Sequence, residues 1–318
     1  MIEWSIDNVK TWPTIALLLL MSSGIFAAPA MAQEIVSPDT VYARVSLISD
    51  RLSQIYKRNL GNLSNIKVPR ELDSRDYYPR HVFQRVLDVE RQISALLNLN
   101  SLKAKPTGVI RIEKYTPVQV MALVKIINQR VGDVKSAVGL SPADKPSSKY
   151  KNKQPINVYV ALDRVELLLR QLGAPSVQPP DVLQRAQMIV HLLSNLCKSY
   201  KCDDLSKRPV SGINLKRPIK VYQEVFKLIE VLNEVEKKLP SRIEGGVLAP
   251  KLETGLIIPD TVNKVVGIIL ADLIEMNRLN GKLTTLDIPR RMGHGSPIEV
   301  WREIDFARRL ALNLAKKI

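Results

Sequence analysis

The chain has 318 residues, of which 45% are hydrophobic, and its formal net charge at pH 7 is +16. This length suffices for one large or two ordinary domains, and two cysteines are too few for a zinc site built from two cysteine pairs. Such an excess of basic residues attracts polyanions, and nucleic acid is the first partner expected for a basic protein. The beginning of the chain argues against that partner.

The first 32 residues have the pattern of a secretory signal peptide. Lys10 precedes an apolar run at residues 14–26, and small residues lead up to a cleavage position after Ala32. The run of about 13 residues is shorter than the roughly 20 that a membrane-spanning helix needs. We therefore expect a periplasmic or secreted protein. The alternative is an inner-membrane anchor formed by an uncleaved signal, because Glu3 and Asp7 offset the charge that Lys10 brings to the N-terminal segment.

The rest of the chain repeats one pattern eight times, a proline followed three residues later by a valine. The pairs are Pro38 and Val41, Pro79 and Val82, Pro117 and Val120, Pro155 and Val158, Pro179 and Val182, Pro218 and Val221, Pro259 and Val262, and Pro297 and Val300. The residues 4, 7, 11 and 14 places after each valine are apolar in every copy. This spacing forms one stripe along an α-helix and does not fit the alternation of a strand.

Each proline is expected to mark the first turn of its helix, where its missing N–H group has no partner to lose. Two copies also have the pattern of a capping box, with Thr116 before Gln119 and Ser296 before Glu299. The residue after the valine is often aromatic, which could indicate stacking of a sugar or a base but is more typical of a widened core face. These aromatic residues are Tyr42, Phe83, Tyr159, Tyr222 and Trp301.

The spacing of the copies predicts an all-α fold of two tandem four-helix bundles. Successive valines are 38 to 41 residues apart, except for a step of 24 residues between Val158 and Val182. We therefore expect a signal peptide at 1–32, a first four-helix unit at 33–175 and a second at 176–318. A single solenoid of eight stacked units is the alternative.

The joins between the predicted helices are long, irregular and rich in proline and glycine, so a second long helix in each repeat is not expected. This separates the pattern from tetratricopeptide, HEAT and armadillo repeats. Short extended pieces are predicted at 65–68, 109–112, 213–216 and 286–288, where apolar residues lie two apart. The joins are long enough for parallel or antiparallel neighbours. Only the short central link favours an antiparallel hairpin, between the fourth and fifth helices.

The join at 141–155 is the most polar and contains four lysines. These are Lys145, Lys149, Lys151 and Lys153. One interpretation is a solvated, flexible loop. The other is a basic arm that binds an anionic partner, so these lysines are the candidate anion-binding residues.

Cys197 and Cys202 are expected to form a structural disulfide, because an exported chain meets an oxidising compartment. Four intervening residues do not match the two of a thioredoxin-like redox pair. The bond is therefore predicted to clip the chain after the fifth helix and to have no catalytic role.

The sequence contains no recognisable catalytic motif. His81, His191 and His294 lack the spacing of paired metal ligands on a helix and are interpreted as incidental. No nucleophile elbow, phosphate-binding loop or dinucleotide fingerprint is present. The carboxylates of Asp203 and Asp204, and those on the sixth helix at Glu230, Glu234 and Glu236, are typical of solvated surfaces. No catalytic residue, metal site or cofactor is predicted.

These observations predict an exported, non-catalytic helical-repeat scaffold or binding protein of the bacterial cell envelope. Without its leader the chain has 46 basic and 29 acidic residues, a net charge of +17. The expected partner is an envelope protein, an anionic envelope polymer or a lipid surface, and nucleic acid is not expected. The alternative is an envelope enzyme that acts on a polymer, with a site built from the long joins. The number of subunits does not follow from the sequence.

Overall fold

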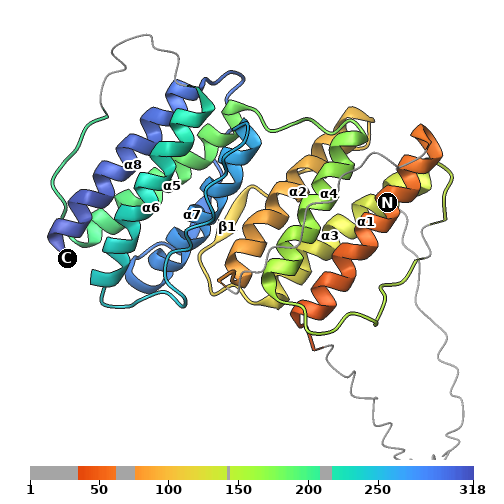
Figure 1. Cartoon of the computed structure of the whole chain (residues 1–318), viewed down its shortest axis with the longest axis horizontal. Helices are drawn as coiled ribbons and strands as arrows, with labels where there is room; N and C mark the ends of the chain where they lie inside the picture. The colour runs from red at the N-terminus through yellow and green to blue at the C-terminus, as the bar shows by residue number, and fades with distance from the viewer. Residues whose placement is uncertain (1–34, 62–75, 142–143, 208–216) are drawn as a thin grey trace, which may run out of the picture. The chain divides into compact units, whose positions relative to one another are not determined.

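Every helix in the described part of the chain begins at the proline of a repeat. The computed structural model describes residues 35–61, 76–141, 144–207 and 217–318, within which eight helices form two groups of four (Figure 1). The helices are α1 Pro38–Leu60, α2 Pro79–Leu99, α3 Pro117–Ala137, α4 Pro155–Gln171, α5 Pro179–Ser199, α6 Pro218–Lys238, α7 Pro259–Asn280 and α8 Pro297–Lys317. The predicted all-α fold of eight repeated helices is confirmed. The signal peptide predicted at 1–32 lies outside the described residues.

At most of these helix starts, the side chain of the third residue after the N-cap accepts a hydrogen bond from the N-cap N–H group. The predicted capping boxes are confirmed, with the Thr116 N–H group donating to Gln119 at 2.9 Å and the Ser296 N–H group donating to Glu299 at 2.7 Å. In α2 the same place is taken by His81, whose Nδ1 accepts from the Tyr78 N–H group at 2.9 Å. Because proline and this side chain together satisfy the first turn, the six helices that have both begin at a defined residue, while α6 and α7 have the proline alone.

The apolar stripe predicted from the repeat forms the core of both groups. All forty stripe positions are buried except Val134 and Leu172, which are half-buried. The aromatic position beside the stripe also belongs to the core, since Tyr159 and Tyr222 are buried and the other three rings pack against buried residues. The widened core face is therefore confirmed.

The four helices of each group run parallel, a question that the sequence left open. The proline and valine that begin all four helices of a group line one small hollow at the same end of that group. Each join within a group must therefore run back along the bundle. A helix of 21 residues is about 32 Å long, and about 17 extended residues span more than 50 Å, so joins of this length are sufficient.

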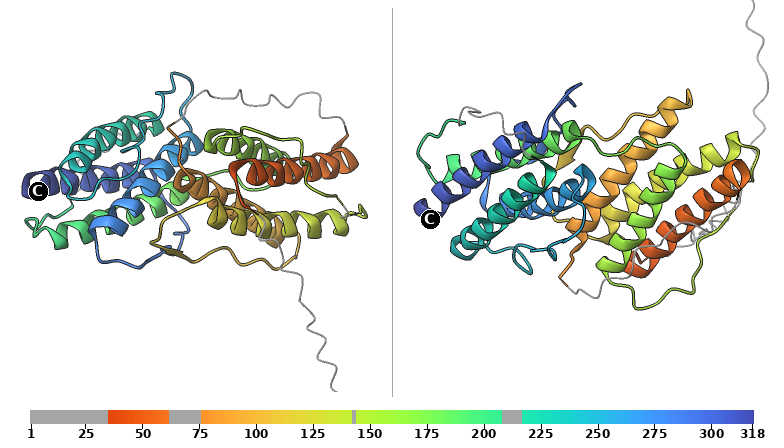
Figure 2. Two further views of the ribbon diagram at one scale, coloured as in Figure 1. Left: turned by 90° about the horizontal axis from the view of Figure 1, so that it is seen from below. Right: turned by 45° about the horizontal axis from the view of Figure 1, so that its top comes forward.

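Within each group the first two helices lie diagonally across the bundle, as do the last two, whereas the second and third helices are neighbours. In the first group, α1 and α2 each pack against α3 and α4, and in the second, α5 and α6 each pack against α7 and α8. The views in Figure 2 show the same two groups. The prediction of an antiparallel hairpin of α4 and α5 is wrong, because these two helices are not among the described pairs that pack against each other. The short link carries the chain from one bundle to the other.

Two of the predicted extended pieces form strands that join the bundles. Strand β1, Val109–Arg111, pairs antiparallel with β2, Thr285–Asp287, and places Ile110 opposite Leu286. Both of these side chains are buried. The pieces predicted at 65–68 and 213–216 lie outside the described residues. The pairing ties the join before α3 to the join before α8.

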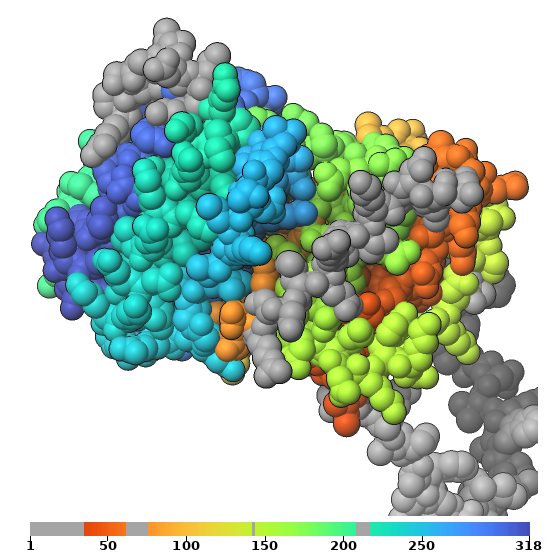
Figure 3. All heavy atoms as spheres, in the orientation of Figure 1, coloured from red at the N-terminus to blue at the C-terminus, as the bar shows by residue number. Residues whose placement is uncertain are grey.

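Helices α2 and α7 pack against each other across the two groups, and residues 36–318 form one compact unit. On the face seen in Figure 3, atoms of the second group lie directly beside atoms of the first. The boundary predicted between residues 175 and 176 falls in the link between α4 and α5, and the division into two domains stays a prediction. None of the described helices is long and apolar enough to cross a membrane.

Candidate functional site between the helix bundles

Helix α2 has two buried faces, and the second of them is charged. Its apolar stripe faces the first bundle, while polar residues at helical spacing face α7 of the second bundle and form ion pairs with α5. Together with residues of α4, α5 and α7 they form a charged interface. Its members are Arg80, His81, Arg85, Asp88, Asp163, Glu166, Arg185, Asp260, Lys264 and Asp272. Desolvated charges of this kind are tolerated only when they are paired.

Asp272 of α7 lies at one end of the charged interface and is 0% exposed. Its Oδ1 accepts from Arg80 Nε at 2.7 Å and lies 2.8 Å from His81 Nε2, and its Oδ2 accepts from the Leu248 N–H group at 2.9 Å. Burial alone would raise the pKa of Asp272, but His81 and Arg80 hold that pKa below its ordinary value. This carboxylate therefore links α2, α7 and the join before α7.

His81 connects the start of α2 to Asp272. Its Nδ1 accepts from the Tyr78 N–H group, so the neutral ring carries its proton on Nε2 and donates to Asp272. Burial lowers the pKa of His81, and Arg80 adds to this, although Asp272 acts in the opposite direction. His81 is 1% exposed and joins the two bundles, a structural role that its sequence pattern did not indicate, and the interpretation that it has no metal-binding or catalytic role stays a prediction.

His81→Asn is expected to reduce the dependence of stability on pH below about 6.5. Because the folded pKa of His81 lies below its unfolded value, the unfolded chain binds a proton that the folded chain does not, and stability falls as pH decreases through this window. Asparagine keeps the cap, as Asn157 does in α4 by accepting from the Gln154 N–H group at 2.8 Å.

The measurement is the urea midpoint between pH 5 and pH 8, in which range the lowered pKa of Asp272 keeps that carboxylate ionised. His191→Asn is the control, since His191 is exposed on α5. An equal slope in wild type and His81→Asn would show that His81 does not set this pH dependence.

Arg85 lies at the centre of the charged interface. Its guanidinium donates to Asp163 at 2.5 and 3.0 Å and also to Glu166, and Lys264 of α7 lies 3.2 Å from Asp163. Burial would raise the pKa of Glu166, but Arg85 and the other nearby cations lower it well below its ordinary range. Asp260 behaves differently, since burial and the neighbouring Glu166 raise its pKa. Each of these carboxylates pairs with cations, which suits a structural role.

Asp88 and Asp181 each form ion pairs with more than one arginine where α2 meets α5. Asp88 lies 2.7 Å from Arg185 and 3.5 Å from both Arg85 and Arg91. Asp181 lies 3.4 Å from Arg91 and 2.6 Å from Arg291. Arg85 is already paired with Asp163 and Glu166, which leaves these two carboxylates to three further guanidinium groups, those of Arg91, Arg185 and Arg291.

Beside these arginines lies a cavity of about 430 Å³, which we call the basic cavity. Its walls come from α2, α5 and α7 and from the joins that contain β1 and β2. The basic side chains that line it are Arg91, Lys105, Arg185, Arg290 and Arg291. The acidic ones are Asp88 and Glu90, and Glu90 is itself paired with Arg130. Its volume is typical of small-molecule sites.

Gln84 lines the basic cavity and is only 2% exposed. Both Nε2 and Oε1 of its amide are shielded from solvent and have no hydrogen-bond partner among the described residues. An unpaired buried amide costs about 1 to 3 kcal/mol. The amide of Gln84 is therefore an unpaired buried polar group, and neither of its polar atoms is exposed to the cavity.

A second hollow of about 550 Å³ lies next to the basic cavity, since Lys105 lines both. It lies between the join that follows α2 and the outer face of α3, and Lys103 and Arg130 also line it. Ile126 contributes an apolar side chain that is 45% exposed. Asp133 lines this hollow as well, so its charged side chains are three basic and one acidic.

The lysines predicted to bind anions lie elsewhere, and none of them lines the basic cavity. Lys145, Lys149 and Lys151 are exposed and Lys153 is half-buried. Lys153 Nζ lies 4.7 Å from the ring centroid of Tyr42, and its N–H group donates to Asp39 at 2.6 Å. This join therefore lies against the beginning of α1.

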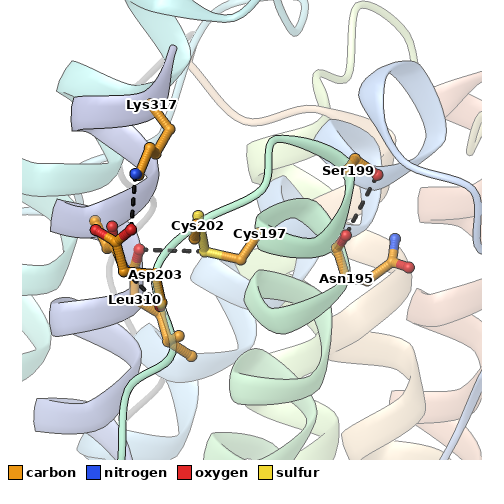
Figure 4. The surroundings of a disulfide bond; sticks show 8 residues. Asn195, Cys197, Ser199, Cys202, Asp203, Leu310 and Lys317 are labelled. Carbon is orange, nitrogen blue, oxygen red and sulfur yellow. Dashed lines mark hydrogen bonds and ion pairs between the residues drawn. A yellow bond between two sulfur atoms is a disulfide. The ribbon is translucent and has the colours of Figure 1, made fainter.

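The predicted bond between Cys197 and Cys202 is present at the end of α5 (Figure 4). Next to it, Asp203 pairs with Lys317 of α8 at 2.7 Å, and its carbonyl accepts from Asn313 at 2.8 Å. The disulfide and these contacts direct the chain from α5 along α8. This position agrees with the predicted role of the disulfide as a structural clip.

The remaining predicted surface groups are exposed, with the exception of Glu236. Glu230 and Glu234 lie on the exposed side of α6, whereas Glu236 is buried. His294 is exposed in the join before α8, and Asp204 is exposed after α5. None of these residues lines the basic cavity.

Sequence reasoning missed Gln84, Arg91, Arg185 and the arginines of the join before α8. The signal that could have found the first two is the second polar face of α2, which continues at helical spacing opposite its apolar stripe. No protein-family model, curated protein or solved structure matches this chain. The candidate site therefore rests on its own geometry.

Proposed function

We propose that this chain is an exported, non-catalytic binding protein of the cell envelope and that its ligand is anionic. The observation that carries the proposal is the basic cavity between the bundles, which has five basic and two acidic side chains in its wall. Both acidic residues already pair with arginine. The cavity therefore attracts negative charge, and guanidinium groups are well suited to carboxylate and phosphate ligands.

Arg290 and Arg291 are the residues that a ligand would meet first. Both are exposed in the join that leads into α8. Arg291 shares Asp181 with Arg91, so one carboxylate neutralises only part of the charge of the pair. Deeper in the wall, Arg185 shares Asp88 with two further arginines. An incoming anion would complete this incomplete pairing.

Export is supported by the leader pattern in the sequence and by the disulfide, which persists in oxidising compartments. The strong excess of basic residues fits an anionic envelope polymer or surface. The enzyme alternative needs acid and base groups with separate roles. The carboxylates in the cavity wall are held in ion pairs instead, which favours binding over catalysis.

Replacing Arg290 and Arg291 with glutamine is expected to weaken binding to an immobilised acidic polysaccharide at least tenfold at low salt. Two charged donors are lost, and a hydrogen bond to a charged group contributes about 1.5 to 3 kcal/mol. The elution salt concentration should fall as well, because fewer charges contribute. Retention in a salt gradient and a direct binding titration measure the two effects.

The matched control replaces Lys149, Lys151 and Lys153 with glutamine, which removes more charge from the join beside α1. A smaller effect in this triple variant supports the cavity as the site. A larger effect would assign binding to the lysine join, and equal retention of all three proteins would overturn the proposed anionic ligand.

A further inference from the structure

We infer that the basic cavity binds an amphiphilic anion, in which an anionic head group is joined to an aliphatic chain. This inference rests on the proposed function and specifies the chemical class of its ligand. The unpaired cations on the solvent side of the cavity account for the head group, and the apolar part of the wall accounts for the chain.

The cations that remain available to an anion lie where the cavity meets solvent. Lys105 and Arg290 are exposed, and neither side chain has a hydrogen bond or an ion pair with any described residue. In the part of the chain that the structure describes, Arg291 uses only its Nε, which donates to Asp181 at 2.6 Å. Arg185, in contrast, is 6% exposed, and both of its terminal nitrogens already donate to carbonyl groups. An anionic head group therefore meets free donors on the solvent side.

Most of the surface that is exposed inside the cavity is apolar. The aliphatic side chains come from α2, α5 and α7 and from the two joins, and the rings of Pro106 and Pro289 add to them. These aliphatic side chains are Leu87, Ile110, Met188, Leu270 and Ile288. An inorganic anion would leave this wall without a partner, whereas a hydrocarbon chain would remove it from water.

The wall suits a flexible chain better than a planar ring. The residues that line the cavity include no aromatic side chain, so an aromatic ligand would find no ring to stack on. Methionine and the branched aliphatic residues can follow an irregular hydrocarbon surface. Because the cavity has a limited volume of about 430 Å³, the gain from lengthening the chain should end once the cavity is full.

The test is a titration of the purified protein at pH 8 with acetate, butyrate, hexanoate, octanoate and decanoate, each below the concentration at which it forms micelles. Affinity should rise about fourfold with each added methylene group until the cavity is full, because burial of one such group contributes about 0.8 kcal/mol. Two comparison ligands separate charge from chain. 1-Octanol lacks the charge and inorganic phosphate lacks the chain, and each should bind at least tenfold more weakly than octanoate.

Ile288→Thr tests the apolar wall. Threonine keeps the branched shape at Cβ and the backbone N–H group that donates to the Gly108 carbonyl at 2.9 Å, but it removes apolar surface. Octanoate binding should weaken at least threefold while acetate and phosphate binding stay unchanged, and the melting temperature without ligand checks the fold. Ile219→Thr, at a 37% exposed site on α6, is the matched control and should change none of these affinities.

The variant with glutamine at Arg290 and Arg291 tests the head group. It should weaken octanoate binding at least tenfold and leave 1-octanol binding unchanged, because only the anion uses these donors. Equal loss for both ligands would mean that the two arginines support the cavity and do not bind the head group, which would contradict the inference.

The outcomes separate this inference from the proposed function. If octanoate binds no better than acetate while the Arg290 and Arg291 variant still loses polysaccharide retention, the anionic ligand stands and its aliphatic chain falls. An affinity that rises without a plateau, or that Ile288→Thr leaves unchanged, would place the chain outside the cavity and overturn the inference. If Ile288→Thr does not fold, the plateau in the wild-type series decides. Absence of binding to every anion tested would overturn both.

Discussion

Leu232→Asp is expected to lower the free energy of unfolding by at least about 4 kcal/mol. Leu232 is 0% exposed and lies on the buried stripe of α6. Truncating a leucine in a packed core costs about 2 to 5 kcal/mol, and a carboxyl group placed there must also be desolvated or protonated. Because whole domains are stable by about 5 to 15 kcal/mol, much of the population should lose the fold.

The midpoint of urea unfolding at neutral pH measures this effect. Ile126→Asp is the matched control, because Ile126 is 45% exposed on α3 and the new carboxylate remains in water. The loss in Leu232→Asp should be smaller in mild acid, since burial raises the pKa of the new carboxyl and its protonation removes the charge. A midpoint equal to that of the control would show that the stripe of α6 is not buried.

The core could be predicted from the sequence because its signal is local and repeated. A proline, a valine three residues later and the apolar spacing of 4, 3, 4 and 3 are contained within one helix, so each copy can be recognised alone. The direction of the helices could not be predicted in this way. A join of about 17 residues is long enough to run back along a helix and begin a parallel neighbour. It can equally begin an antiparallel neighbour close to the point where the helix ends. The sequence contains no feature that selects between the two.

The candidate site is hard to predict because its members are distant in the sequence. Arg80 and Asp272 are 192 residues apart, and Arg85 and Asp163 are 78 apart. When one helix is considered alone, its sequence does not distinguish a buried carboxylate such as Asp88 from an exposed one such as Glu230. Only packing of α2 against the second bundle distinguishes them. The sequence predicts anion binding at the lysine-rich join because its four lysines lie close together in the chain. Comparison of the lysine variant with the Arg290 and Arg291 variant tests that prediction.

Asp272→Ala is expected to lower the free energy of unfolding by about 3 to 5 kcal/mol, because removing one partner of a buried ion pair leaves uncompensated groups. Arg80 would retain a neighbour in the Gly246 carbonyl, to which it donates at 3.1 Å, but would lose its counter-ion. His81 Nε2 and the Leu248 N–H group would lose their acceptor as well. The effect should appear in α2 and α7 together, since this carboxylate joins the two bundles.

Urea unfolding at pH 7 measures the loss, with Glu230→Ala as the control for removal of an exposed carboxylate from a helix. Because the pKa of Asp272 is lowered in the folded protein, its contribution is complete above its unfolded pKa of about 3.9 and is lost as pH falls through the folded value. The difference between wild type and Asp272→Ala should therefore shrink in acid. If Asp272→Ala were as stable as the control, desolvation would cancel the attraction at this end of the charged interface. The apolar contacts of α2 with α7 would then hold the bundles together.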